Sequence, residues 1–261
     1  MIPKKYNNIF FDKLSKYLKK GDVVYLESDL TAFNKIFTSS KSKSDFLEFF
    51  FILFKKLIGS SGNLIVPTFS YSWGDEKKQK VFDIKKTNSS TGIFPAYLLN
   101  KKNSSRTKDP MFSFAIFGKD KMYFSKIGKN TFGKKSIYKK LYKKKAKLVS
   151  FGLNRFDPTF VHYVEQYFHT NIGEIDYRYI KKVTGTINDK GKKYKDTYFT
   201  FLRKKHIKKT YEEKNIKKIL LKNKKLKLIK LFSADIYIVD AIDFFEYGVE
   251  GMKKNRNFFV K

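Results

Sequence analysis

Three short apolar segments, GDVVYLES, NLIVPTFS and AKLVSFG, alternate along the chain with segments of helical character. Each apolar run is too short for a typical helix and is apolar at consecutive positions, which indicates a strand buried on both faces of a sheet. Strands that alternate with helices predict an α/β fold, an α/β/α sandwich with a mostly parallel central sheet. Helices are expected over residues 8–19, 45–58, 92–99, 158–169, 211–222 and 241–252.

The four residues Asn188-Asp189-Lys190-Gly191 lie between two extended segments, 177–187 and 194–202. This turn chemistry predicts an antiparallel hairpin that is added to the sandwich. Residues 71–91 are polar and are expected to form a loop. Because no repeat or linker divides the sequence, we expect one domain over residues 1–261.

The composition is strongly basic, with 57 Lys and Arg against 24 Asp and Glu and a net charge of +33. The lysines occur in nearly every segment and arginine is scarce, so a nucleic-acid partner is not expected. A positive surface instead attracts anionic small molecules. The absence of Cys excludes disulfides, thiolate nucleophiles and Cys-ligated zinc, and it fits a cytoplasmic location.

The apolar segments are also too short for a membrane protein. The most apolar run, FLEFFFILF, is far below the roughly 20 residues of a membrane span, and the N-terminal segment has no uninterrupted apolar stretch. We therefore expect no membrane span and no secretory signal.

Two of the three histidines occur in one segment, DPTFVHYVEQYFHT, which runs from residue 157 to residue 170. Asp157 is a good N-cap and Pro158 suits the first helical position, so a helix is predicted from Pro158 onwards. On that helix His162 and Glu165 share a polar stripe beside an apolar one. Glu165 can then orient the His162 imidazole, while the helix N-terminus disfavours its protonation.

The spacing of this pair leaves two interpretations open, an ordinary surface or packing pair and a catalytic base with its orienting carboxylate. A metal site is not expected, because His162 and His169 with one glutamate lack the ligand set that zinc requires. The motifs GxGxxG, GxxxxGK[ST] and GxSxG are absent, so neither a nucleotide-binding fingerprint nor a serine-hydrolase elbow is supported.

Polar residues follow the predicted strands, and ligands of α/β proteins bind at the carboxyl ends of strands. The loop TNSSTG precedes a predicted helix and can present backbone N–H groups to a ligand. Ordinary turn chemistry explains each of these positions equally well.

Five segments, taken in order, resemble the aminoglycoside 3-N-acetyltransferase family, whose members use acetyl-CoA. They are GDVVYLESDL, GNLIVPTFSYS, FDIKKTNSSTG, SSRTKDPMFSFAIFG and LVSFGLNRFDPTFVHYVEQ, and the resemblance covers roughly residues 21–187. It implies an acyltransferase with acetyl-CoA as co-substrate and no metal. His162 aligns with the family's catalytic general base, and Glu165 aligns with a carboxylate three residues further on.

The resemblance also implies roles for the loops at the strand ends. The residues expected to bind the cofactor are Ser28, Asp29, Ser89, Thr91 and Gly92. Those expected to bind the acceptor substrate are Glu27, Thr68, Ser70 and Asp109.

Two positions depart from the antibiotic-modifying members that the sequence resembles. Asp109 stands where they have histidine, and Lys204 or Lys205 falls nearest to a later carboxylate. An acidic pocket suits a polycationic aminoglycoside, whereas this chain has lysine near the later carboxylate position and is strongly basic. We therefore expect a different acceptor, an amino sugar or nucleotide-linked sugar of lipopolysaccharide or capsule synthesis. Alternatives are an aminoglycoside 3-N-acetyltransferase that confers antibiotic resistance, a catalytically impaired CoA- or sugar-binding homologue, and a basic nucleic-acid-binding domain. A homodimer is one expected assembly.

Overall fold

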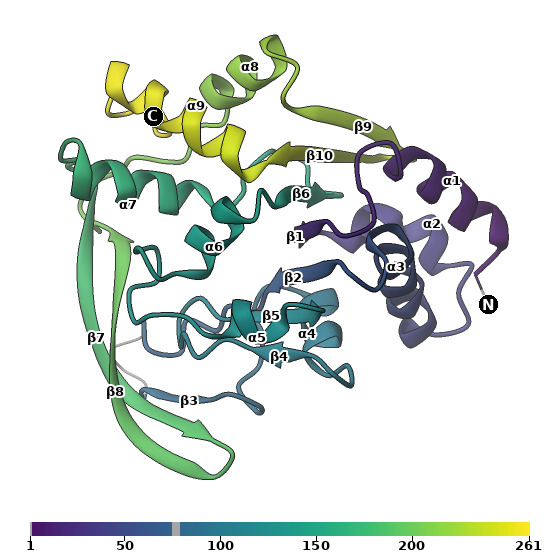
Figure 1. Ribbon diagram of the computed structural model, residues 1–261, viewed down its shortest axis with the longest axis horizontal. Coiled ribbons are helices and arrows are strands. Elements are labelled where there is room, and N and C mark those ends of the chain that lie inside the picture. Colours follow the sequence, from purple (N-terminus) through teal and green to yellow (C-terminus); the bar gives the residue numbers. More distant parts are fainter. Residues whose placement is uncertain (1, 75–78) are drawn as a thin grey trace.

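The computed structural model describes residues 2–74 and 79–261. These residues form a seven-stranded sheet whose order is β4-β5-β2-β1-β6-β10-β9 (Figure 1). The strands are β1 (Val23–Ser28), β2 (Asn63–Pro67), β4 (Ser105–Arg106), β5 (Phe114–Gly118), β6 (Lys147–Phe151), β9 (Lys227–Leu231) and β10 (Ala234–Asp240).

Helices cover both faces of this sheet, because successive strand residues point to opposite sides. Val24 and Leu26 of β1 belong to one apolar core, while Val23 and Tyr25 belong to the other. The first core is closed by η1 (Leu30–Phe33), α1 (Lys4–Leu14), α2 (Asn34–Phe37), α3 (Lys43–Ile58) and α4 (Ile93–Leu99). The second is closed by α5 (Lys121–Ser125), α6 (Ile137–Lys143), α7 (Val161–Asn171), α8 (Lys214–Lys222) and α9 (Ala241–Lys254).

The predicted α/β/α class is confirmed, and the sheet is more mixed than expected. Its centre, β2-β1-β6, is parallel, whereas β5 and β10 pair antiparallel with the strands beside them. The tight β9-β10 turn, in which Phe232 has φ of 58°, forces those two strands to run in opposite directions. Apolar periodicity reports burial and not strand direction, so it could not reveal this.

A three-stranded sheet, β3-β7-β8, lies beside the sandwich. The predicted hairpin is confirmed as β7 (Arg178–Asp189) and β8 (Lys192–Arg203), a long arch in Figure 1. Its turn residues Lys190 and Gly191 both have positive φ, as a two-residue type I′ turn requires.

The strand β3 (Val81–Asp83) lies in the segment expected to be a loop, of which residues 75–78 are outside the described part. It pairs parallel with β7 and buries Phe82 completely. The expectation of a continuous loop was wrong here, because three residues are too few to give a periodic signal.

The predicted start of α7 was also wrong. The helix begins at Val161, its N-cap is Phe160, and Asp157 pairs with Arg155 instead of capping the helix. The N–H of Thr159 is directed at Glu27 of β1, which holds the preceding turn outside the helix. No helix in the described ranges is long and apolar enough to cross a membrane.

Candidate active site

The imidazole of His162 lies in the first turn of α7 and contacts a buried carboxylate. Its Nδ1 is 2.8 Å from Oε2 of Glu165, whose side chain is 1% exposed. An ionised carboxylate can only accept, so Nδ1 carries the proton and Nε2 keeps its lone pair. The predicted His–Glu pair therefore has the arrangement of a base with its orienting group.

Two residues at the start of β7 complete the surroundings of Glu165. The Tyr177 hydroxyl donates to Oε1 at 3.1 Å, and Nε of Arg178 forms an ion pair with Oε2 at 2.9 Å. The Arg178 guanidinium also donates to the Phe201 carbonyl across the hairpin, with an N···O distance of 3.2 Å. Glu165 is thus fixed from three sides.

These contacts set the charge of the pair. Burial lowers the pKa of His162 below its usual 6.5, and the nearby Arg178 guanidinium lowers it further against the attraction of Glu165. Burial alone would raise the pKa of Glu165, but Arg178 and His162 outweigh it and hold that pKa below its usual value. At neutral pH the site therefore contains an unprotonated imidazole that is hydrogen-bonded to an ionised carboxylate.

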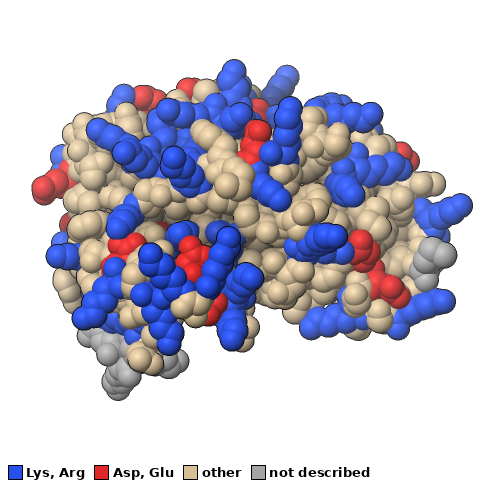
Figure 2. Space-filling view, turned by 60° about the horizontal axis from the view of Figure 1, so that its bottom comes forward, with Lys and Arg blue, Asp and Glu red and all other residues tan. Residues whose placement is uncertain are grey.

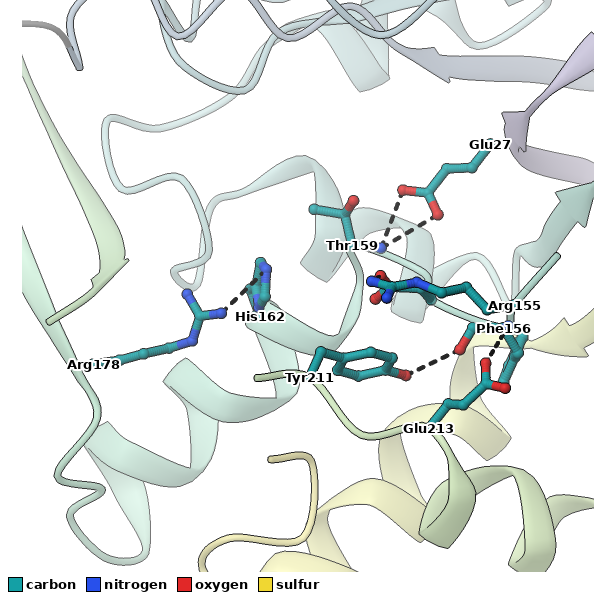
Figure 3. Close-up of polar contacts among 9 residues, drawn as sticks. Glu27, Arg155, Phe156, Thr159, His162, Arg178, Tyr211 and Glu213 are labelled. Carbon is teal, nitrogen blue, oxygen red and sulfur yellow. Dashed lines mark hydrogen bonds and ion pairs between the residues drawn. The ribbon is translucent and has the colours of Figure 1, made fainter. Parts of the chain in front are cut away.

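The other ring nitrogen of His162, Nε2, faces the Arg178 guanidinium, and the residue is part of the lining of a cavity. The side chain is 22% exposed, and the Phe132 ring lies perpendicular to the imidazole at 5.7 Å between ring centres. Nε2 is 3.4 Å from Nη2 of Arg178, as Figure 3 shows. The cavity measures about 460 Å³ and is lined by Arg155, Asp157, His162, Arg178, Arg203, Thr210, Tyr211 and Lys261.

Glu27, predicted to bind the acceptor, holds the loop that precedes α7. Its carboxylate accepts the Thr159 N–H at 3.1 and 3.3 Å (Figure 3). It also accepts the Tyr25 hydroxyl at 2.5 Å. Burial raises its pKa to about 7, although these hydrogen bonds act in the opposite direction. The observed contacts of Glu27 therefore fix the loop that leads to His162.

The other residues predicted to bind the acceptor are engaged within the fold. Asp109 is buried and accepts the N–H groups of Met111 and Phe112 as well as the Thr131 hydroxyl. Thr68 is fully buried, with its hydroxyl 3.1 Å from that of Ser113, and Ser70 donates to the Pro110 carbonyl. None of Asp109, Thr68 and Ser70 lines the cavity beside His162.

The residues predicted to bind the cofactor lie at the end of β1 and in the segment between β3 and α4. Asp29 caps the turn after β1 by accepting the Thr31 N–H and hydroxyl. Ser89 and Thr91 share a hydrogen bond of 2.8 Å, and Thr91 donates to the Pro67 carbonyl at the end of β2. These loops lie at the carboxyl edge of the parallel strands, where α/β proteins bind ligands.

Gly92 and Ser28 complete the set of residues predicted to bind the cofactor. Gly92 has φ of 107° and open space where a Cβ would stand, and it precedes α4. The Ser28 hydroxyl is buried and has no hydrogen-bond partner within the described part of the chain.

Sequence reasoning missed the residues that the hairpin and later segments bring to His162. Arg178 and Tyr177 follow α7 without any periodic link to it, and Arg203 becomes adjacent only through the pairing of β7 with β8. Tyr211 and Arg155 contact through a cation–π arrangement, with 6.0 Å between the guanidinium carbon and the ring centre. The scarcity of arginine is the one sequence signal that could have singled out these positions.

The fold places the chain among α/β acetyltransferase structures. It is similar to aminoglycoside acetyltransferase AAC(3)-Xa (TM-score 0.75, 15% identity, 95% of this chain and 92% of that one). It is similar to AAC-IIIb, solved as a binary complex with CoASH (TM-score 0.75, 14% identity, 95% and 96%). It is also similar to the YokD protein from Bacillus subtilis (TM-score 0.72, 15% identity, 96% and 94%).

A family model described as aminoglycoside 3-N-acetyltransferase matches residues 46–253. The chain therefore belongs to this family and is an acyltransferase, and the prediction of an acetyl-CoA-dependent enzyme of this class is confirmed. A search of curated proteins finds no match. Within residues 2–74 and 79–261, no group of three or more His, Asp or Glu is placed to hold a metal ion.

Proposed function

We propose that the chain, as one domain over residues 1–261, transfers the acetyl group of acetyl-CoA directly to the amine of an amino sugar. One observation carries this proposal: the imidazole of His162 is oriented by a buried carboxylate and lies in the lining of a cavity. Membership of the acetyltransferase family supports the same chemistry. The acceptor amine would occupy the cavity, and the thioester would approach from the loop that follows β1 and from the segment between β3 and α4.

In this mechanism the amine nitrogen attacks the thioester carbonyl, and Nε2 of His162 removes the proton from the nitrogen. The new C–N bond forms, the C–S bond breaks, and the imidazolium returns its proton to the departing thiolate. Glu165 keeps the ring in one tautomer and stabilises the imidazolium while it exists. Burial, followed by the charge of the Arg178 guanidinium, lowers the pKa of His162, so the resting imidazole is ready to accept a proton at neutral pH.

The experiment measures CoA thiol release with a panel of amino sugars, sugar phosphates, nucleotide-linked amino sugars and aminoglycosides. His162→Ala is expected to lower turnover about 10²–10⁴-fold, because the general base is lost. His206→Ala removes an exposed histidine elsewhere and is the matched control. Undiminished turnover in a folded His162→Ala protein would overturn the mechanism.

The same panel separates the proposed acceptor from a second candidate. The family description favours an aminoglycoside 3-N-acetyltransferase, which would acetylate aminoglycosides faster than simple amino sugars. A chain that is thermally stabilised by CoA but turns over none of the panel would instead be a binding homologue without catalysis. The cytoplasmic location, the homodimer and a role in lipopolysaccharide or capsule synthesis stay predictions.

A further inference from the structure

The cavity beside His162 has an unusual charge for a site that must admit an amine. The described residues that line it include four cations and one carboxylate. Only five of the 57 basic residues in the chain are arginine, yet three of those five, Arg155, Arg178 and Arg203, meet in this cavity. Arginine offers a rigid fork of donors that matches phosphate and carboxylate oxygens, which lysine does not.

Two of these arginines are held against each other by the hairpin. Arg178 and Arg203 are direct partners in the antiparallel register of β7 and β8, so their side chains leave the same face of the ribbon. Like charges directly opposite one another destabilise a strand pair. Arg178 is compensated by Glu165, whereas the Arg203 guanidinium has no ion-pair or hydrogen-bond partner among residues 2–74 and 79–261.

The third arginine approaches the cavity from the loop before α7. Arg155 pairs with Asp157, its side chain is 62% exposed, and it lies over the Tyr211 ring. Figure 3 shows Arg155 and Arg178 extending toward the region of His162 from opposite sides. Lys261, also in the lining, is 66% exposed and lies 3.5 Å from Glu212. Of the four cations in the lining, three therefore have a carboxylate partner, and among the described residues Arg203 alone has none.

We propose that this cavity binds a phosphate group of the acceptor, so that the substrate is a phosphate-bearing amino sugar and Arg203, with Arg155, determines specificity for it. This inference rests on the proposed function, whose substrate class it narrows. A volume of about 460 Å³ is within the range of small-molecule sites and suits a sugar phosphate. The bound phosphate supplies the countercharge that the Arg178–Arg203 pair lacks.

CoA also carries phosphate groups and is a second source of phosphate for an acyltransferase site. The geometry of this cavity favours the acceptor as the source. The phosphates of CoA lie at the far end of the pantetheine arm from the thioester. The cations of this cavity surround the nitrogen that must contact the amine, with Arg178 only 3.4 Å from it. An anion held there belongs to the molecule that carries the amine.

The test measures binding in the absence of an acyl donor. The probes are glucosamine 1-phosphate and methyl glucosaminide, which differ in the phosphate, and the readout is calorimetric affinity. We expect the wild type to prefer the phosphate-bearing probe and Arg203→Gln to weaken its binding about 10-fold or more, since charged hydrogen bonds are lost. Arg203→Lys should restore part of the affinity, because it restores the charge without the fork.

Lys13→Gln makes the same change in net charge on α1, against the opposite face of the sheet, and should leave the affinity unchanged. The inference would be overturned if the wild type bound both probes with equal affinity. It would also be overturned if Arg203→Gln bound glucosamine 1-phosphate as tightly as the wild type does. Arg203→Gln could instead raise the KM for acetyl-CoA and leave the KM for acetyl-dephospho-CoA unchanged. That result would assign the phosphate bound by Arg203 to CoA and would also overturn the inference.

Binding separates this inference from the proposed function. His162→Gln should retain the Arg203-dependent phosphate affinity even though it cannot transfer the proton. Arg203-dependent binding together with full turnover in His162→Ala would leave the phosphate site standing and remove the mechanism. Turnover that is lost in His162→Ala but unchanged in Arg203→Gln would retain the mechanism and remove the phosphate site.

Discussion

Replacing Glu165 by Gln leaves the shape of α7 nearly unchanged and removes one buried charge. The carboxylate is 1% exposed and lies within 2.9 Å of Arg178, whose side chain is 7% exposed. Losing one partner of a buried pair strands the other charge and typically costs about 3–5 kcal/mol. For a chain of this size that loss lowers the melting temperature by about 6–20 °C.

Urea unfolding and thermal melts of Glu165→Gln measure this cost. The double variant Glu165→Gln/Arg178→Met removes both charges, so its destabilisation should be smaller than the sum of the two single variants. The acetylation rate should fall even in the double variant, because a neutral amide cannot stabilise an imidazolium as a carboxylate does. A loss below about 1 kcal/mol in Glu165→Gln, or simple additivity in the double variant, would refute a tightly coupled buried pair.

The two remaining predictions concern protonation. With only three histidines in the chain, NMR should resolve the imidazole of His162, and its titration midpoint should lie below 6.5 because of burial and Arg178. In Arg178→Met this pKa should move upward, and a wild-type midpoint at or above 6.5 would contradict the assigned electrostatics. Glu27 has a pKa raised from 4.5 to about 7 by burial, so between these values the folded state holds a proton that the unfolded chain has released. The contribution of Glu27 to the free energy of unfolding is therefore fully present below pH 4.5 and is lost as the pH rises to about 7. The loss amounts to at most about 3 kcal/mol. Glu27→Gln should flatten this part of the pH dependence in urea unfolding, and an unchanged slope would count against it.

The layers of the fold and the central pair of the site could be predicted from the sequence because both are local patterns. Continuous apolar runs identify buried strands, and three-residue spacing brings His162 to Glu165 on any helix. Gly59 ends α3 as expected, with φ of 66°. These features depend on residues that are close in the chain.

The parts that could not be predicted depend on long-range pairing. The antiparallel pairing of β10 with β6 joins strands far apart in the chain, and the displacement of the α7 start follows from a hydrogen bond between Thr159 and Glu27, which are 132 residues apart. The Arg178–Arg203 pair arises from the hairpin register. No periodic pattern in one sequence encodes such contacts.

The distribution of arginine connects composition to the site. Basic side chains spread over the face shown in Figure 2, and all but five of the 57 basic residues of the chain are lysine, whose flexible ammonium serves as well as a guanidinium on an open surface. Two of the five arginines use their guanidinium inside the protein, and the first, Arg106, is buried and donates to the carbonyls of Thr68 and Thr87 and to the Ser113 hydroxyl. Arg178 uses its fork on Glu165 and Phe201. By the same reasoning, the guanidinium of Arg203 in the cavity suits a partner with two oxygens placed to accept its paired N–H groups, which the described part of the chain does not provide, and the phosphate of the proposed acceptor has such oxygens.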